Sequence, residues 1–344
     1  MTRSMRAVRV TRPATRPEIV SIPVPEPGPG QVRIRVAGAG LCHSDLLVIH
    51  ADPPFFPLPL TLGHETTGWV DAMGAGTSGV KEGDAVAVYF PWGCGHCARC
   101  AHGEENICAV PTLGPGAGRD GGMAEYLLVD DARHLVPLGN LDPVVAAPLM
   151  CAGLTTYHAI HDALGKLTPG SSVVLIGIGG LGHLAVQIAR SISPAKIIAI
   201  DMHEAKLSHA RKLGAHAAVV GGLGADDRVR ALIGSDGAAL VIDMVGNDAT
   251  MALGLKVLGY GGELKVVGVG GGALPVTFFS MPRDASVNTP YAGTLSDCYE
   301  VVQLAASGLV VPQVQRIGFD GVIDAYERME RGEIQGRAVL VPDM

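Results

Sequence analysis

From about residue 171 to residue 269, short apolar runs alternate with stretches whose apolar residues recur at helical spacing. Short runs of β-branched and aliphatic residues are typical of strands buried on both faces of a parallel sheet. The alternation predicts a doubly wound α/β fold, in which helices connect parallel strands. The predicted strands are residues 173–176, 197–200, 217–220, 240–243 and 264–267.

The first 140 residues show a different pattern, with alternating apolar positions separated by proline- and glycine-rich turns. Residues 5–10 and 31–37 alternate most clearly, which predicts strands of a β-rich domain. Residues 143–164 read as an interrupted helix, and the tail adds a helix at 297–306 and a strand at 338–341. A chain of 344 residues is also too long for one typical core, so two domains are expected.

The first α/β strand is followed by Gly177, Gly179 and Gly182, which have the G-x-G-x-x-G spacing. In this context the first glycine permits a tight turn, the second lets a pyrophosphate approach, and the third lets the helix pack closely on the strand. The next strand ends at Asp201, whose carboxylate can accept hydrogen bonds from a ribose diol and repels a 2′-phosphate. The stretch predicts a site that prefers NAD to NADP, although a glycine-rich turn without ligand is the alternative.

Charge and hydropathy remove several other classes of protein. The net charge is −7 and no basic tract occurs, which argues against binding of nucleic acid or of an anionic membrane surface. No apolar run of about 18 residues and no signal-peptide core is seen, so we expect a cytoplasmic protein. In that compartment the seven cysteines are expected to be metal ligands or buried thiols, not disulfides.

Cys94, Cys97, Cys100 and Cys108 follow C-x2-C-x2-C-x7-C. Four thiolates this close in sequence can surround one tetrahedral zinc ion, which leaves no open position and predicts a structural site. An iron–sulfur cluster is the alternative, but the proline-marked fourth cysteine of that pattern is missing. Independent buried cysteines are a further alternative.

Cys42, His64 and Cys151 are far apart in sequence, so each can equally be an ordinary core residue. Their neighbours favour a second, open metal site, because Cys42 is followed by His43, Ser44 and Asp45, and Glu65 follows His64.

These motifs occur in the order found in zinc-dependent medium-chain alcohol dehydrogenases, and the chain resembles that family over almost its whole length. Residues 91–95 and 132–137 make it most similar to the bacterial NAD-dependent secondary-alcohol dehydrogenases. The resemblance implies an α/β protein with a β-rich GroES-like catalytic domain (1–150, to which 290–344 returns) and a Rossmann coenzyme domain (151–289). It also implies a homo-oligomer, a dimer or tetramer.

The resemblance assigns Cys42, His64 and Cys151 to a catalytic zinc, with Glu65 close enough to exchange with a ligand. Asp45 would orient the imidazole of His64. Ser44 would accept the proton as hydride passes from a zinc-bound alkoxide to NAD, and its alternative is a helix cap. Where many relatives carry a histidine that ends the relay, this chain has Leu47. The proton must then leave through His43, His50 or water, and His43 can equally contact the pyrophosphate.

By the same resemblance, further residues bind the coenzyme or line the substrate pocket. Lys206 would contact the ribose, with a solvated helix charge as its alternative, and Arg337 would bind the pyrophosphate through its planar guanidinium. The coenzyme set also includes Gly180, Leu181, Thr155, Val267, Gly268 and Val269, and the substrate walls would be Leu47, Phe55, Trp92 and Tyr291.

The expected function is therefore that of an NAD-dependent alcohol dehydrogenase (EC 1.1.1.-, closest to 1.1.1.1) with two zinc ions per chain. It would interconvert small to medium apolar primary or secondary alcohols with aldehydes or ketones. Two alternatives use the same scaffold. A zinc-free enoyl or quinone reductase would leave the second metal set idle, and a non-catalytic NAD-binding relative would not need Ser44.

Overall fold

A computed structural model of the chain describes residues 3–110 and 114–343. Its contacts divide the chain into two compact units. The first unit comprises Met1–Cys151, Thr294–Ser307 and Pro312–Met344, and the second comprises Ala152–Gly293 and Gly308–Val311. The polypeptide thus leaves the first unit after Cys151 and returns to it near its C-terminal end.

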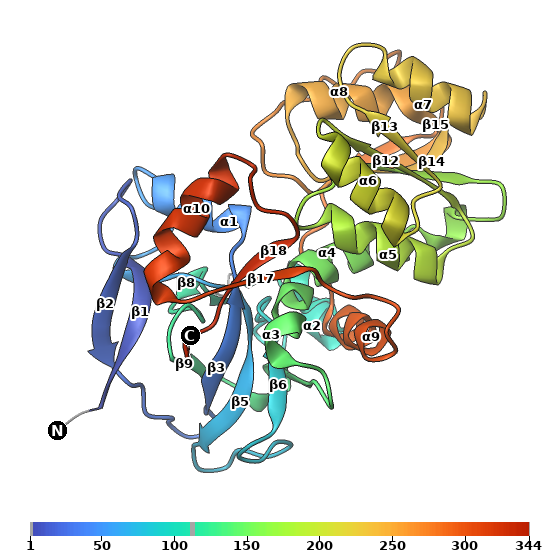
Figure 1. Cartoon of the computed structure of the whole chain (residues 1–344). Helices are drawn as coiled ribbons and strands as arrows, with labels where there is room; N and C mark the ends of the chain where they lie inside the picture. Colours follow the sequence, from blue (N-terminus) through green and yellow to red (C-terminus); the bar gives the residue numbers. More distant parts are fainter. Residues whose placement is uncertain (1–2, 111–113, 344) are drawn as a thin grey trace. The chain divides into compact units, whose positions relative to one another are not determined.

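The first unit consists mainly of strands connected by turns and short helices (Figure 1). Its strands are β1 (Ser4–Val10), β2 (Glu18–Pro23), β3 (Val32–Gly40), β4 (Leu60–Thr61), β5 (Glu65–Met73), β6 (Ala85–Val88), β7 (Gly114–Pro115), β8 (Gly118–Arg119), β9 (Tyr126–Val129), β10 (Leu135–Pro137), β17 (Val314–Ile317) and β18 (Arg337–Leu340). Its α-helices are α1 (His43–His50), α2 (Ala98–Ala101), α3 (Pro143–Ala146), α9 (Leu295–Ala306) and α10 (Val322–Glu330), and its 3-10 turns are η1 (Glu105–Ile107), η2 (Ala132–His134), η3 (Ala147–Met150) and η5 (Phe319–Gly321).

Strand β3 lies at the middle of a seven-stranded sheet of order β10-β6-β5-β3-β18-β17, with β9 also paired to β3. The alternating residues Val32, Ile34 and Val36 are all buried, as their spacing predicts. The C-terminal strand β18 runs antiparallel to β3, with Val339 opposite Gly40 (Figure 1, red beside blue). A strand from the first 40 residues and the last strand of the chain therefore share one sheet.

The second unit is a six-stranded parallel sheet of order β13-β12-β11-β14-β15-β16 with helices in the connections (Figure 1). Its elements are α4 (Ala152–His161), η4 (Leu164–Lys166), β11 (Ser172–Ile176), α5 (Gly182–Ile192), β12 (Lys196–Asp201), α6 (Glu204–Leu213), β13 (Ala217–Val220), α7 (Ala225–Ile233), β14 (Ala238–Asp243), α8 (Asp248–Val257), β15 (Leu258–Val266) and β16 (Ser286–Asn288). The predicted doubly wound sheet is confirmed. Its strand order reverses between β11 and β14, where ligands bind in open α/β sheets.

Helices α1 and α10 of the first unit were not predicted. The first begins immediately after Cys42, where the polar residues His43, Ser44 and Asp45 were interpreted as part of a metal site and not as the start of a helix. Residues 143–164 do form helices, but the segment is broken at Cys151, between η3 and α4. This break sets the Cys151 backbone apart from both helices, at φ −131° and ψ −63°.

Within the described ranges, no single helix has the length and apolar character needed to cross a membrane. One bent pair, Pro143–Met150 with Ala152–His161, meets that test only when the two helices are taken together.

Candidate metal and coenzyme sites

The four cysteines of the lobe at residues 94–108 lie with their sulfur atoms within 4.8 Å of one another. Individual sulfur–sulfur distances are 3.6 Å for Cys97 and Cys100, 3.7 Å for Cys97 and Cys108, and 3.9 Å for Cys94 and Cys100. Tetrahedral ligation at about 2.3 Å per thiolate places neighbouring sulfurs about 3.8 Å apart. The donor set and its spacing therefore fit one zinc ion.

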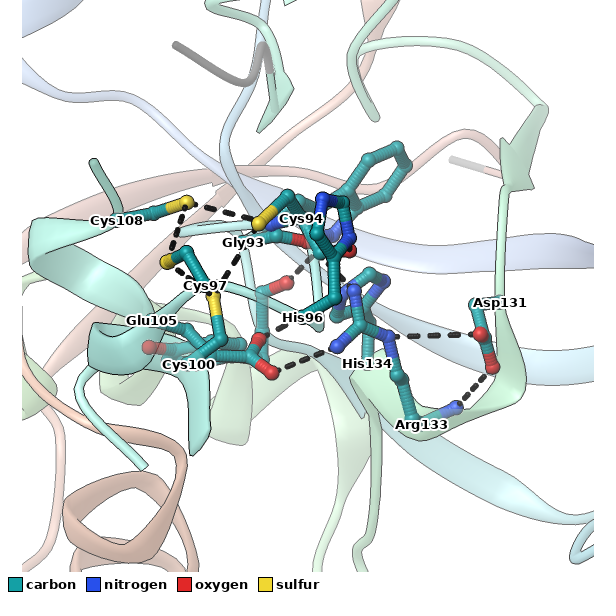
Figure 2. A network of polar contacts seen from close by, with 12 residues as sticks. Gly93, Cys94, His96, Cys97, Cys100, Glu105, Cys108, Asp131, Arg133 and His134 are labelled. Atoms are coloured by element: carbon teal, nitrogen blue, oxygen red, sulfur yellow. Dashed lines mark hydrogen bonds and ion pairs between the residues drawn. The ribbon is translucent and has the colours of Figure 1, made fainter. Parts of the chain in front are cut away.

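Arg133 connects this lobe to the body of the first unit (Figure 2). Its guanidinium donates to the backbone carbonyl of Gly93 at 2.6 Å and to Glu105 Oε1 at 2.7 Å. Beside it, the ring of His134 stacks on Trp92 with centroids 5.0 Å apart. Burial, together with the positive charge of Arg133, lowers the pKa of His134 to about 3, so its ring is neutral near pH 7.

A second cluster forms from Cys42, His64, Glu65 and Cys151, whose ligand atoms also lie within 4.8 Å of one another. All four residues are buried. Cys42 caps α1, Glu65 begins β5 directly after His64, and Cys151 occupies the break before α4. The fold thus gathers donors that are widely separated in sequence, as the resemblance implies.

The charges of this cluster suit a divalent ion. A hydrogen bond shared with Cys151 lowers the pKa of Cys42 well below its ordinary value, and that same contact raises the pKa of Cys151. Two thiolates and one neutral imidazole balance Zn²⁺. Glu65 supplies a fourth potential donor, and burial raises the pKa of its carboxyl to about 7, although Arg337 acts in the opposite direction.

Asp45 lies behind His64, with its Oδ1 atom 3.2 Å from His64 Nδ1. Its other oxygen accepts the backbone N–H of Cys42 at 2.9 Å. Burial disfavours the charged form of His64, but Asp45 and Cys42 together raise its pKa well above the ordinary value. Asp45 is thus positioned to fix the ring orientation, while the orienting role itself stays a prediction.

Ser44 Oγ lies 3.6 Å from Cys42 Sγ, beside the cluster. It is not the helix cap, because that position belongs to Cys42 and the capping carboxylate is that of Asp45. His43 and Leu47 are exposed on α1. His50 Nε2 lies 2.6 Å from Glu330 Oε1 on α10. A proton route through His50 stays a prediction.

Arg337 begins β18 and is 3% exposed. Its Nε atom donates to Glu65 Oε2 at 3.0 Å, and Nη2 makes a second, close contact with Oε1. This is the fork-to-fork geometry that arginine forms with carboxylates. A role of Arg337 at the pyrophosphate stays a prediction. Its contact with Glu65 was not predicted.

The glycine loop of the second unit follows β11. Gly177 has φ +92°, and a Cβ atom at Gly182 would lie 2.2 Å from the carbonyl oxygen of Gly177. A side chain is therefore strained at the first position and sterically blocked at the third. Asp201 accepts the backbone N–H of Ile178 at 2.8 Å and that of His203 at 3.0 Å. The acid at the end of β12 thus lies next to this loop, as its predicted role requires.

Sequence reasoning missed Asp243, which ends β14 and is fully buried. Its backbone carbonyl accepts the N–H groups of Val267 and Gly268, at 2.8 and 3.0 Å. Its carboxylate accepts those of Val245 and Gly246, at 2.9 and 3.0 Å. Asp243 therefore fixes the backbone of Val267 and Gly268, two residues of the predicted coenzyme set. The sequence did offer a signal for Asp243, because an acidic residue at the end of a buried strand is the same pattern that singled out Asp201.

The other predicted contacts are more dispersed. Thr155 is buried on α4 and Lys206 is half-buried on α6. Leu47, Phe55 and Tyr291 are exposed, whereas Trp92 is buried, donates to the carbonyl of Tyr89 at 2.7 Å and stacks on His134. A place in the substrate wall stays a prediction for all four, and the contacts of Trp92 favour a structural role.

Two family models match the sequence. Residues 28–140 match the alcohol dehydrogenase GroES-like domain and residues 180–307 match the zinc-binding dehydrogenase model. The chain is 35% identical to an NAD-dependent alcohol dehydrogenase of Sulfurisphaera tokodaii, over 99% of this chain and 100% of that protein. An alcohol dehydrogenase of Geobacillus stearothermophilus is 37% identical, with 88% of each chain covered. The chain belongs to the zinc-dependent medium-chain alcohol dehydrogenases.

The structure of this dehydrogenase is similar to solved alcohol dehydrogenase structures over almost its whole length. The crystal structure of an alcohol dehydrogenase from Aeropyrum pernix matches with a TM-score of 0.91 and 34% identity, over 98% of this chain and all of that one. Family membership identifies this dehydrogenase as an oxidoreductase of class EC 1.1.1.- with zinc and NAD as cofactors. The zinc-free reductase and the non-catalytic relative are not favoured.

Proposed function

We propose that Cys42, His64 and Cys151 hold the catalytic zinc of an NAD-dependent dehydrogenase for small to medium apolar alcohols and ketones. One observation carries the assignment: two cysteines, a histidine and a glutamate, all buried, bring their ligand atoms within 4.8 Å of one another. Three of these donors leave a zinc ion with an open position for substrate, unlike the four-cysteine lobe.

When bound there, zinc supplies a Lewis acid that lowers the pKa of an alcohol hydroxyl and polarises a carbonyl in the reverse reaction. When bound, NAD would supply the hydride acceptor, so that oxidation of an alcohol yields a carbonyl compound, NADH and H⁺. Ser44 Oγ would accept the proton of the alcohol while its own hydroxyl proton passes on to solvent. The hydroxyl of Ser44 beside Cys42 Sγ supports this role. Asp45 holds the ring of His64 in one orientation.

Activity measurements test the assignment directly. Primary and secondary alcohols, and the matching aldehydes and ketones, are offered with NAD or NADP, with and without a chelator, and NADH absorbance is followed. We expect turnover of apolar substrates with NAD and its loss when the chelator removes zinc. A fully metallated protein that leaves every such alcohol and ketone unchanged contradicts the proposal.

Asp201 tests the coenzyme half of the proposal. Asp201→Ala removes the carboxylate proposed to bind the ribose diol, and the loss of such hydrogen bonds raises KM for NAD about 10–100-fold. Asp201→Asn is the matched control, because it keeps an acceptor for the N–H of Ile178 but removes the charge that repels NADP. Unchanged discrimination between NAD and NADP in both variants makes the ribose assignment wrong.

We further propose that the protein is a cytoplasmic homo-oligomer, a dimer or tetramer. None of the seven cysteines forms a disulfide, which agrees with a reducing compartment. Phe278 and Phe279 are 90% and 94% exposed in the segment before the edge strand β16, which supports contact with a second copy there. The sedimentation coefficient of a Phe278→Ser/Phe279→Ser variant tests this. An oligomer of unchanged size would show that this surface is not the contact between copies.

A further inference from the structure

Helix α10 directs one polar group into the interior of the first unit. Tyr326 is 3% exposed, and its hydroxyl donates to Asp45 Oδ2 at 2.9 Å. The sulfur of Met123 lies 3.0 Å from the same hydroxyl. A carboxylate oxygen is a much better acceptor than a thioether, so the proton points to Asp45. Two residues that are 281 positions apart are thereby linked in the core.

The carboxylate that receives this bond already contacts two groups of the proposed metal centre. Oδ2 accepts the N–H of Cys42, and Oδ1 lies beside Nδ1 of His64. Asp45 is 1% exposed, so water does not replace a missing donor easily. Without the hydroxyl of Tyr326, one of the few donors that hold this buried carboxylate in place is lost.

We propose that Tyr326 is a positioning residue of the catalytic metal centre. Its hydroxyl fixes the rotamer of Asp45, and Asp45 in turn keeps the proton of His64 on Nδ1. Nε2 is then the nitrogen that carries the lone pair for the metal. This inference rests on the proposed function, because it assumes that His64 is a ligand.

The same C-terminal return supports the other acidic group of the centre. Arg337 of β18 binds Glu65, and Tyr326 of α10 binds Asp45. Both carboxylates, Glu65 in the cluster and Asp45 beside it, are therefore held by a side chain from residues 312–344. The ligands come from the first 151 residues of the chain, but the groups that orient their neighbours come from its end.

Tyr326→Phe removes only the hydroxyl and keeps the ring that packs in the core. Loss of such an outer partner costs about 10–100-fold in metal affinity. We expect one of two zinc ions to be lost to a chelator at least about tenfold faster than in the wild type, as followed with a metallochromic indicator. The other zinc, in the four-cysteine lobe, should leave at the wild-type rate and serves as an internal control.

Cobalt substitution at the centre gives a second readout that a merely structural role would not change. The d–d absorption bands of Co²⁺ report ligand geometry, so they should shift in Tyr326→Phe. They should stay unchanged in Met123→Leu, which alters the other neighbour of the hydroxyl but leaves the bond to Asp45. Unchanged cobalt bands together with unchanged zinc release in Tyr326→Phe overturn the inference.

A double-mutant cycle with Asp45→Asn separates positioning from stability. If Tyr326 acts through Asp45, Tyr326→Phe should change zinc release far less when Asp45→Asn is already present than in the wild type. Equal effects in both backgrounds overturn the inference, whatever happens to the melting temperature. His64→Ala tests the underlying assignment independently, because retention of two zinc ions in that variant refutes the metal site itself.

Discussion

The four-cysteine lobe and the Cys42–His64–Cys151 centre are built in opposite ways. In the lobe, backbone N–H groups of its own loop stabilise the thiolate of Cys97: those of Cys100 and Ala109 lower its pKa to about 6. All four cysteines are only half-buried. In the centre, the ligands are buried and side chains hold them. Asp45 contacts His64, while Tyr326 and Arg337, from the C-terminal segment, hold Asp45 and Glu65.

This difference fits the two proposed roles, a structural site for the lobe and a catalytic site for the centre. A local loop that binds an ion with four thiolates closes the coordination shell and stabilises its own fold. A centre assembled from several elements can leave one position open, because no single loop has to wrap the ion. It depends instead on groups that keep each ligand in one rotamer.

The largest expected effect is the loss of dehydrogenase activity when a ligand of the centre, and not of the lobe, is removed. His64→Ala or Cys42→Ala removes a ligand of the centre, so kcat/KM should fall at least about 10³-fold. NADH binding, measured by fluorescence, should persist because the coenzyme loop belongs to the second unit. Metal analysis should find one zinc per chain, and a variant that keeps two zinc ions with full turnover contradicts the comparison.

Removing a ligand of the lobe should instead affect stability. Cys100→Ala should lose the zinc of the lobe and lower the melting temperature by more than about 5 °C, since structural zinc contributes directly to folding. The kcat of the molecules that remain folded should stay within about threefold of the wild type. If kcat falls as far as in His64→Ala while the melting temperature is unchanged, the lobe is not merely a brace.

The smallest predicted effect lies beside the lobe and depends on pH. The folded pKa of His134, about 3, is below its ordinary value of 6.5, so below pH 6.5 the unfolded chain binds a proton that the folded chain does not. This contribution to stability is complete above pH 6.5 and is lost as pH falls towards 3, at about 1.4 kcal/mol per pH unit.

His134→Phe keeps an aromatic ring against Trp92 but cannot titrate. Between pH 6.5 and 5, the free energy of unfolding of the wild type should therefore fall by about 2 kcal/mol more than that of the variant. Urea titrations at the two pH values measure this difference. A parallel loss in both proteins would mean that His134 is not held neutral by burial.

The contrast between local and distant ligands also explains which parts of the two sites could be predicted from the sequence. The spacing of Cys94 to Cys108 and of Gly177 to Gly182 encodes local geometry, so both motifs were found from the residues alone. Cys42, His64 and Cys151 needed the resemblance to a known family, because nothing local brings them together. The α/β alternation similarly predicted the second unit, in which successive strands are near in sequence.

Neither local motifs nor the family resemblance predicted the contacts of Tyr326 and Arg337 with the centre. The spacing of Val322, Ala325, Tyr326 and Met329, all buried, marks one face of an amphipathic helix. That pattern could have placed Tyr326 in the core, but not opposite Asp45. The contact between Arg337 and Glu65 depends in the same way on the pairing of β18 with β3, which no local pattern specifies.

The placement of β18 also constrains the order of events during synthesis. Ala39 and Gly40 pair with Leu340 and Val339, so the central sheet of the first unit is incomplete until nearly the whole polypeptide has left the ribosome. The second unit, apart from four residues, is continuous in sequence and can fold earlier. The nascent chain can therefore acquire the fold of its second unit before it can complete the surroundings of the proposed catalytic ion.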